Sequence, residues 1–153
     1  MPIDRTAAGS VKVTASEPIR TAEPLHGLRV LCIDNEPLIL EGMKLLLEGW
    51  GCNVATTPSL DIWQQGLTVH DLRPDAIIAD YHLDDGTGID MIQAIRLYFG
   101  TDIPSLLVTA DRSPEVRASA ERDGITLQNK PVRPASMRAW LTQLSVSMKA
   151  AAE

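Results

Sequence analysis

The sequence predicts one α/β domain with an open, doubly wound parallel sheet of five strands and five helices. Short apolar runs alternate with amphipathic helical patterns from Leu28 onward, and this alternation is typical of α/β folds. The connections between them are short, so right-handed crossovers place helices on both faces of the sheet. Residues 76–79 are apolar at every position, which indicates a central strand that is covered on both faces.

Chain length sets the expected domain organisation. The 153 residues suffice for one domain with tails. Residues 1–27 mix prolines, glycine and short polar residues without amphipathic period, so we expect a linker or disordered tail, in which Val11 and Val13 suit a short strand. We expect the domain itself at residues 28–146 and a C-terminal tail at residues 147–153.

Charge and hydropathy exclude two classes of function. The net charge is -6, the pI is about 5.0 and the basic residues are scattered, whereas a nucleic-acid surface needs clustered Lys and Arg. No apolar run approaches the roughly 20 residues that span a bilayer, and no signal-peptide pattern is visible. We therefore expect a cytoplasmic protein without direct membrane contact. Cys32 and Cys52 lack metal spacing and are expected to be buried, reduced thiols.

The first half of the domain is expected to contain two strands and two helices. Residues 29–33 form an apolar run, and Pro37 suits the first position of the helix that follows. One face of that helix carries apolar residues at a period of 3.6, namely Ile39, Met43, Leu46, Leu47 and Trp50. A second strand at residues 53–56 precedes a helix that begins at Pro58-Ser59. The core-facing residues of that helix are Leu60, Trp63 and Leu67.

The second half continues the alternation. The strand at residues 76–79 ends at Asp80, and a polar loop at residues 81–88 precedes a helix at residues 89–99. The remaining predicted elements are a strand at 105–108, a helix that begins at Ser113-Pro114, a strand at 125–128 and a helix at 134–148. The domain therefore contains the five strands and five helices of a doubly wound sheet.

Polar residues stand where four of the five predicted strands end. Asp34 and Asn35 follow the first strand, Asp80 the third, Thr109 the fourth and Lys130 the fifth. Ligands bind beyond the carboxyl ends of parallel strands, so we expect these residues to converge. Each of them alone has an ordinary structural explanation, such as a helix cap, a turn residue, a strand-end hydroxyl or a solvated charge. Their shared edge favours a functional site.

These residue types suit phosphoryl transfer to a carboxylate. Neighbouring carboxylates at Asp34 and Asp80 repel one another unless a hard cation lies between them, and Mg²⁺ favours one or two carboxylates with waters and phosphate oxygens. An ionised carboxylate needs no base to attack phosphorus, so catalysis is mainly positioning and charge neutralisation. Lys130 and Thr109 would contact phosphoryl oxygens only after transfer, and that difference between states is what a switch requires.

Four sequence runs resemble the response-regulator receiver family of two-component signalling. They are Val30-Leu31-Cys32-Ile33-Asp34-Asn35-Glu36-Pro37, Pro74-Asp75-Ala76-Ile77-Ile78-Ala79-Asp80, Leu107-Val108-Thr109-Ala110 and Asn129-Lys130-Pro131. The resemblance covers about residues 28–144. It implies a flavodoxin-like sheet with strand order 2-1-3-4-5 and a phosphohistidine donor, which is a histidine kinase or a histidine phosphotransfer domain.

The same resemblance implies a role for each site residue. Asp80 is the implied phospho-acceptor, and Thr109 and Lys130 are implied to contact the phosphoryl group. The implied Mg²⁺ ligands are Asp34, Asn35, Asp80 and the backbone carbonyl of His82. The bond between Lys130 and Pro131 is expected to be cis, a state that X-Pro bonds reach at modest cost.

Three positions depart from the family pattern. Asn35 stands where the family commonly has a second acidic residue, which lowers the expected affinity for Mg²⁺, and either the amide oxygen or Glu36 is expected to compensate. Asp84 replaces a proline, which leaves the loop geometry less fixed. Leu127 replaces a switching Tyr or Phe, so we expect output through backbone and helix shifts. The sequence at residues 34–37, 46–52 and 79–84 also resembles receivers at the C-termini of hybrid sensor histidine kinases. Residues 9–14 would then be a remnant of the last strand or linker of the kinase.

Other functions compete with the phospho-accepting switch. A pseudo-receiver that binds partners without phosphorylation is the main alternative, motivated by Asn35 and Leu127. An aspartyl-phosphate hydrolase of the haloacid-dehalogenase type would need an acid at His82, and a flavodoxin would need a Ser/Thr-rich loop after the first strand. Few residues follow Leu144, so we expect output through protein contact. By resemblance, its surface is the fourth helix, fifth strand and fifth helix.

Overall fold

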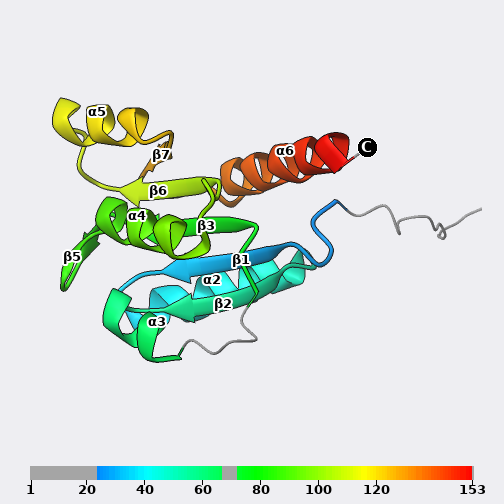
Figure 1. Cartoon of the computed structure of the whole chain (residues 1–153), viewed down its shortest axis with the longest axis horizontal. Helices are drawn as coiled ribbons and strands as arrows, with labels where there is room; N and C mark the ends of the chain where they lie inside the picture. The colour runs from blue at the N-terminus through cyan, green and yellow to red at the C-terminus, as the bar shows by residue number, and fades with distance from the viewer. Residues whose placement is uncertain (1–23, 67–71, 153) are drawn as a thin grey trace, which may run out of the picture.

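In the computed structural model, which describes residues 24–66 and 72–152, a five-stranded parallel sheet lies between two layers of helices (Figure 1). The strands of this sheet are β1 (Arg29–Ile33), β2 (Asn53–Thr57), β3 (Ala76–Asp80), β6 (Ser105–Thr109) and β7 (Thr126–Asn129). The helices are α2 (Pro37–Gly49), α3 (Leu60–Gly66), α4 (Gly88–Phe99), α5 (Pro114–Arg122) and α6 (Pro134–Ala152). The sheet order β2-β1-β3-β6-β7 confirms the predicted flavodoxin-like order 2-1-3-4-5.

Two apolar cores lie on opposite faces of the sheet. Ile78 belongs to the core that α2 and α6 cover, whereas its neighbour Ile77 belongs to the core covered by α4 and α5, because successive strand residues point to opposite faces. In Figure 1, α2 lies behind the sheet and α4 in front of it. The central strands β3 and β6 are buried at every position. They therefore hold their terminal residues Asp80 and Thr109 on a rigid base.

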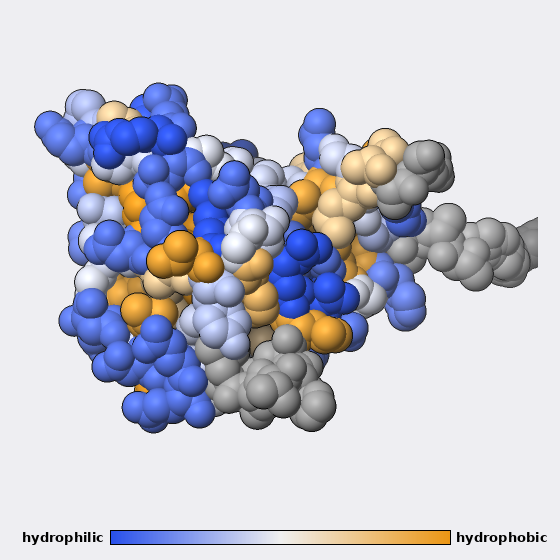
Figure 2. Space-filling model, viewed as in Figure 1, coloured by the Kyte–Doolittle hydropathy of each residue, from blue (hydrophilic) through white to orange (hydrophobic). Residues whose placement is uncertain are grey.

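Hydrophilic residues predominate over α5 and α3 on the face shown in Figure 2, and hydrophobic residues show between them. Leu97 and Tyr98 of α4 are exposed. Within the described residues, no helix combines the length and apolar character needed to cross a membrane.

The apolar stripe of α2 differs from the expected one by one residue near its start. Leu47 is buried, and Met43 and Trp50 pack against the core, as predicted. Leu40, however, is buried, whereas Ile39 is 43% exposed. The reason is that Ile39 faces an open pocket beside α6, so the first turn of α2 packs through Leu40 instead.

Several element boundaries extend beyond the predicted ones. Residues expected to be a polar loop contain a small antiparallel hairpin of β4 (His82–Leu83) and β5 (Gly86–Thr87). α6 ends at Ala152, so residues expected to be a tail continue the helix. Leu25, expected to lie in the linker, is fully buried. The Ser145 hydroxyl of α6 donates a hydrogen bond to the Pro24 carbonyl. The predicted strand at Val11 and Val13, and the core role of Leu67, lie outside the described residues.

Candidate functional site

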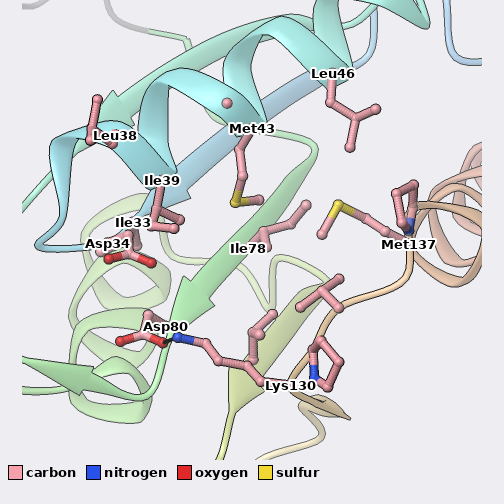
Figure 3. Close-up of a pocket in the computed structure, with 15 residues that line it drawn as sticks. Ile33, Asp34, Leu38, Ile39, Met43, Leu46, Ile78, Asp80, Lys130 and Met137 are labelled. Atoms are coloured by element: carbon pink, nitrogen blue, oxygen red, sulfur yellow. Dashed lines mark ion pairs between the residues drawn. The ribbon is translucent and has the colours of Figure 1, made fainter.

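The carboxyl ends of β1, β3, β6 and β7 bring the predicted site residues to one edge of the sheet. Ile33 pairs with Ala79 in the β1–β3 ladder, so the next residues, Asp34 and Asp80, lie side by side. Val108 pairs with Asp80 and precedes Thr109. In Figure 3, Asp34 approaches Asp80 from the side of α2, and Lys130 approaches it from the side of β7.

Lys130 forms an ion pair with Asp80. The Lys130 Nζ lies 2.7 Å from Asp80 Oδ1, and the two side chains are 41% and 10% exposed. The hydrogen bond to Asp80 raises the pKa of Lys130, burial opposes this, and the charges of Asp80, Asp34 and Glu36 raise it further. The peptide bond between Lys130 and Pro131 is cis, as the family resemblance implied. One cation therefore partly neutralises the carboxylate pair.

Asp34 is buried beside Asp80 and has two roles, one at the entry to α2 and one at the candidate site. Its Oδ1 accepts a 2.9 Å hydrogen bond from the backbone N–H of Glu36, just before α2. Burial raises the pKa of Asp34, the Glu36 hydrogen bond lowers it, and the Asp80 charge raises it again. The helix-entry role and the site role are thus compatible, because Asp34 has a second carboxylate oxygen. The raised pKa of Asp34 therefore reflects mainly its burial, with a smaller part from the Asp80 charge, which the Lys130 charge opposes.

The Asn35 side chain is hydrogen-bonded to Asp84, a contact that the sequence did not predict. Its Nδ2 donates a 2.8 Å hydrogen bond to Asp84 Oδ1, at the turn of the β4–β5 hairpin. Two of the three departures from the family pattern, Asn35 and Asp84, therefore contact one another. The sequence shows that both positions depart from the family pattern. It does not show that they are in contact, because the two residues are 49 positions apart and no local pattern joins them.

The Thr109 hydroxyl is held by the loop that follows β6. Thr109 is 1% exposed, and its Oγ1 accepts a 2.9 Å hydrogen bond from the backbone N–H of Asp111. In the part of the chain that the structure describes, Thr109 makes no hydrogen bond to Asp80. Its hydroxyl proton remains available for another acceptor, since a hydroxyl donates and accepts at once. The contact with Asp111 was not predicted.

His82 and Leu127 lie at the margin of the site. The His82 side chain is exposed, and its ring packs edge-on against Tyr81 at 4.8 Å. Hydrogen bonds from Ser113 are the main cause of the lowered pKa of Asp111, and the His82 charge adds a small part. Leu127 is half-buried against the core below α5. Among the described residues, no hydrogen bond, ion pair or ring contact joins either side chain to Asp80, and the expected role of the His82 backbone carbonyl as a metal ligand stays a prediction.

The donor set suits Mg²⁺ better than a metal that needs many side-chain ligands. The carboxylates of Asp34 and Asp80 lie side by side, Asn35 follows Asp34 in the chain, and Mg²⁺ uses one or two carboxylates with waters and phosphate oxygens. Among residues 24–66 and 72–152, no group of three or more His, Cys, Asp or Glu side chains gathers in a way that could hold a metal. Zinc and calcium sites, with more protein ligands, fit this edge less well.

An apolar pocket of about 670 Å³ opens beside the carboxylates, between α2 and the start of α6 (Figure 3). Its polar end consists of Asp34, Asp80 and Lys130, and the remaining lining residues are nearly all apolar. Ile39 and Met43 line it from α2, and Ile78 lines it from β3.

Comparison with known proteins agrees with this geometry. The chain matches the protein family described as "Response regulator receiver domain" over residues 30–142. It is 32% identical over 116 residues to the phyllosphere-induced regulator PhyR of Methylorubrum extorquens, covering 74% of this chain and 42% of that protein. It is 30% identical over 107 residues to the DNA-binding response regulator MtrA of Mycolicibacterium smegmatis, covering 69% and 45%. The chain thus matches less than half the length of each of these relatives.

Solved structures show the same fold. The chemotaxis protein CheY4 of Vibrio cholerae superimposes with a TM-score of 0.65 at 25% identity, covering 77% of this chain and 98% of that one. A CheY-like receiver domain protein of Methanospirillum hungatei gives a TM-score of 0.70 at 18% identity, covering 81% and 98%. The family match spans the sheet and the strand ends that carry Asp34, Asp80, Thr109 and Lys130. The chain therefore belongs to the response-regulator receiver domain family.

Proposed function

We propose that this receiver domain accepts a phosphoryl group on Asp80 from a phosphohistidine donor and then changes its contacts with protein partners. The observation that carries the proposal is the ion pair of Lys130 and Asp80 at 2.7 Å, next to the buried Asp34. A carboxylate held between a cation and a second carboxylate is ready to share its charge with a metal and a phosphoryl group. The donor would be a histidine kinase or a histidine phosphotransfer domain.

Each residue has a defined part in the proposed transfer. A carboxylate oxygen of Asp80 forms a bond to phosphorus as the P–N bond to the donor histidine breaks and the imidazole nitrogen keeps the electron pair. Lys130 neutralises charge on the transferred group. Asp34, Asn35, Asp80 and the His82 backbone carbonyl would hold Mg²⁺, which supplies charge neutralisation for the carboxylates and the phosphoryl oxygens when bound.

Thr109 provides the proposed link from phosphorylation to a change in shape. Its hydroxyl proton is available to a phosphoryl oxygen, while its Oγ1 already accepts from the Asp111 backbone. A new bond to the phosphoryl group would therefore pull on the loop between β6 and α5. With Leu127 in place of an aromatic residue, the proposed output runs through this loop and through shifts of α5 and α6.

Incubation with acetyl phosphate and Mg²⁺, followed by intact-mass measurement, tests the proposal. We expect the native chain to gain the mass of one phosphoryl group, and we expect Asp80→Asn to gain none. Omission of Mg²⁺ should suppress the gain in the native chain. A native chain that gains no mass, beside a conventional receiver that does, would rule the proposed function out.

The same experiment decides for or against a second candidate, a pseudo-receiver that binds partners without phosphorylation. Two observations favour it: position 35 carries the neutral amide of Asn35 in place of a second carboxylate, and Leu127 lacks the ring of a switching aromatic residue. Such a domain would bind the same partner equally well as the native chain and as Asp80→Asn. A phosphorylation-dependent affinity would exclude this candidate.

The partners and the compartment follow from the same proposal. The net charge of -6 favours protein partners over nucleic acid, and the buried thiols Cys32 and Cys52 are unpaired, which fits a reducing cytoplasm. Attachment to a hybrid histidine kinase stays a prediction that the parent reading frame tests. The domain limits 28–146 also stay a prediction, which limited proteolysis tests.

A further inference from the structure

The hydrogen bond between Asn35 and Asp84 joins two loops of the candidate site. Asn35 directly follows Asp34 after β1, and Asp84 lies four residues after Asp80 at the turn of the β4–β5 hairpin. The Nδ2–Oδ1 distance is 2.8 Å, and the partners are 49 residues apart in the chain. The contact therefore fixes the β1–α2 loop relative to the hairpin that carries the phospho-acceptor's neighbours.

The chemistry of the pair fixes which way the amide faces. An ionised carboxylate only accepts hydrogen bonds, so the NH₂ group of Asn35 must point toward Asp84 and its Oδ1 must point elsewhere. Nothing in the described residues donates a hydrogen bond to that oxygen. The amide oxygen is thus free to bind a cation, next in the chain to the Asp34 carboxylate.

The charge of Asp84 also changes the amide electronically. A hydrogen bond to a charged acceptor is shorter and stronger than a neutral one, and it polarises the donor group. A polarised amide carries more negative charge on its oxygen and is a better ligand for a hard cation. Carboxylates that orient a metal ligand from behind act in this way in many metal sites, and their loss typically lowers metal affinity about 10–100-fold.

We propose that Asp84 is a positioning residue of the cation site: it orients and polarises the Asn35 amide so that Asn35 Oδ1 is the third protein oxygen, beside Asp34 and Asp80, for a divalent cation. This inference rests on the proposed function. It explains how a receiver that has lost an acidic residue at position 35 keeps a cation site. The negative charge has moved from the ligand to the residue behind it.

The test is calorimetric titration of the unphosphorylated chain with MgCl₂. We expect Asp84→Ala to weaken Mg²⁺ binding about tenfold. Asp85→Ala is the matched control, because Asp85 is the adjacent exposed carboxylate of the same turn, and we expect its affinity to stay within about twofold of the native value. Asp84→Asn keeps an acceptor oxygen and is expected to restore part of the loss. Equal losses in Asp84→Ala and Asp85→Ala would overturn the inference, because only general charge would then matter.

A double-mutant cycle separates positioning from direct ligation. In the Asn35→Ala background, Asp84→Ala should produce no further loss of Mg²⁺ affinity, because the amide through which it acts is gone. Additive losses would overturn the inference. The ¹⁵N resonance of the Asn35 side chain should shift on Mg²⁺ binding in the native chain and not in Asp84→Ala, and thermal unfolding checks that every variant is folded.

The two proposals fail in different ways. If the native chain binds Mg²⁺ and becomes phosphorylated, but Asp84→Ala binds Mg²⁺ as the native chain does, only the role of Asp84 is wrong. If the native chain neither binds Mg²⁺ nor gains phosphoryl mass, the proposed function is wrong, and the role of Asp84 is wrong with it.

Discussion

The ion pair of Lys130 and Asp80 joins a partly exposed ammonium to a nearly buried carboxylate. Exposed pairs contribute about 0–1 kcal/mol to stability, whereas removal of a group that stabilises developing charge slows catalysis about 10²–10³-fold. The contribution of Lys130 to the proposed reaction should therefore greatly exceed its contribution to folding.

Lys130→Met tests this difference. We expect its free energy of unfolding to stay within about 1 kcal/mol of the native value and its phosphorylation by acetyl phosphate to slow about 100-fold. Urea unfolding and intact-mass time courses measure the two quantities. Lys130→Arg is the control that keeps the charge. A large loss of stability with little change in rate would show that Lys130 is structural.

Asp34 presents the opposite case, a carboxylate whose charge costs stability. Burial, the largest cause, and the Asp80 charge raise the pKa of Asp34. A carboxyl with a raised folded-state pKa contributes stability that is complete below the unfolded pKa and is lost as the pH rises through the folded value. Ionisation of Asp34 therefore costs the folded protein more free energy than it costs the unfolded chain.

Asp34→Asn should be more stable than the native chain at pH 7, by about 0.5–2 kcal/mol. Its amide oxygen can still accept from the Glu36 N–H, so the entry to α2 is kept. Urea unfolding at pH 7 and pH 4 measures the gain, which should shrink at the lower pH as the native carboxyl becomes protonated. MgCl₂ should stabilise the native chain and not the variant. Lower stability of the variant at pH 7 would contradict this account.

At the scale of elements, Gly88 lets the chain pass from the β4–β5 hairpin into α4 directly beside the end of β3. Its backbone N–H donates a 2.8 Å hydrogen bond to the Tyr81 carbonyl, and a Cβ at this position would lie 2.3 Å from the Asp80 carbonyl oxygen. Only glycine lets the start of α4 approach the Asp80 backbone this closely. The hairpin and α4 therefore set the position of Asp80 together.

Gly88→Ala should destabilise the domain by about 1–3 kcal/mol, because the added methyl group must displace backbone. It should also slow phosphorylation, because Asp80 moves with that backbone. Gly42→Ala in α2 is the control: a Cβ there has no heavy atom within 4 Å, so alanine should be neutral or stabilise by up to about 1 kcal/mol. Thermal unfolding of both variants checks the prediction, and equal stability would contradict it.

For the molecule as a whole, the core that α2 and α6 cover contains two ionisable thiols, Cys32 and Cys52, whose environment links stability to pH. Burial, together with the Cys52 charge, raises the pKa of Cys32 to about 12, and burial raises the pKa of Cys52 to about 11. In the unfolded chain both thiols ionise near the ordinary value of about 8.5. Their contribution to stability is therefore complete below that value and is lost as the pH rises toward 11 and 12.

We expect the free energy of unfolding to fall steadily from about pH 9 upward. Urea unfolding at pH 7, 9 and 10 measures the decline. The double variant Cys32→Ala, Cys52→Ala should show a flatter profile over the same range, although it is less stable at pH 7. Identical slopes in the two proteins would show that other groups cause the decline.

The sequence predicted the strands well and the contacts between loops poorly, for physical reasons. β3 is apolar on both faces, which few structures other than a central strand require. The β4–β5 hairpin has two residues in each strand, too few to show any period. The order of strand ends predicted that Asp80 and Lys130 converge, because strand ends share an edge, but it did not predict the ion pair between them. The bond between Asn35 and Asp84 depends on where a hairpin turns, and no pattern in either segment encodes it.

The most direct test of the central claim is to locate the phosphoryl group chemically. Borohydride reduces an aspartyl phosphate to homoserine, so the phosphorylated chain can be reduced, digested and sequenced by mass spectrometry. We expect homoserine at position 80, directly after Ala79, and unmodified aspartate at positions 34, 84 and 85. Homoserine at another aspartate, or at none in a chain that has gained phosphoryl mass, would contradict the assignment of Asp80 as the phospho-acceptor.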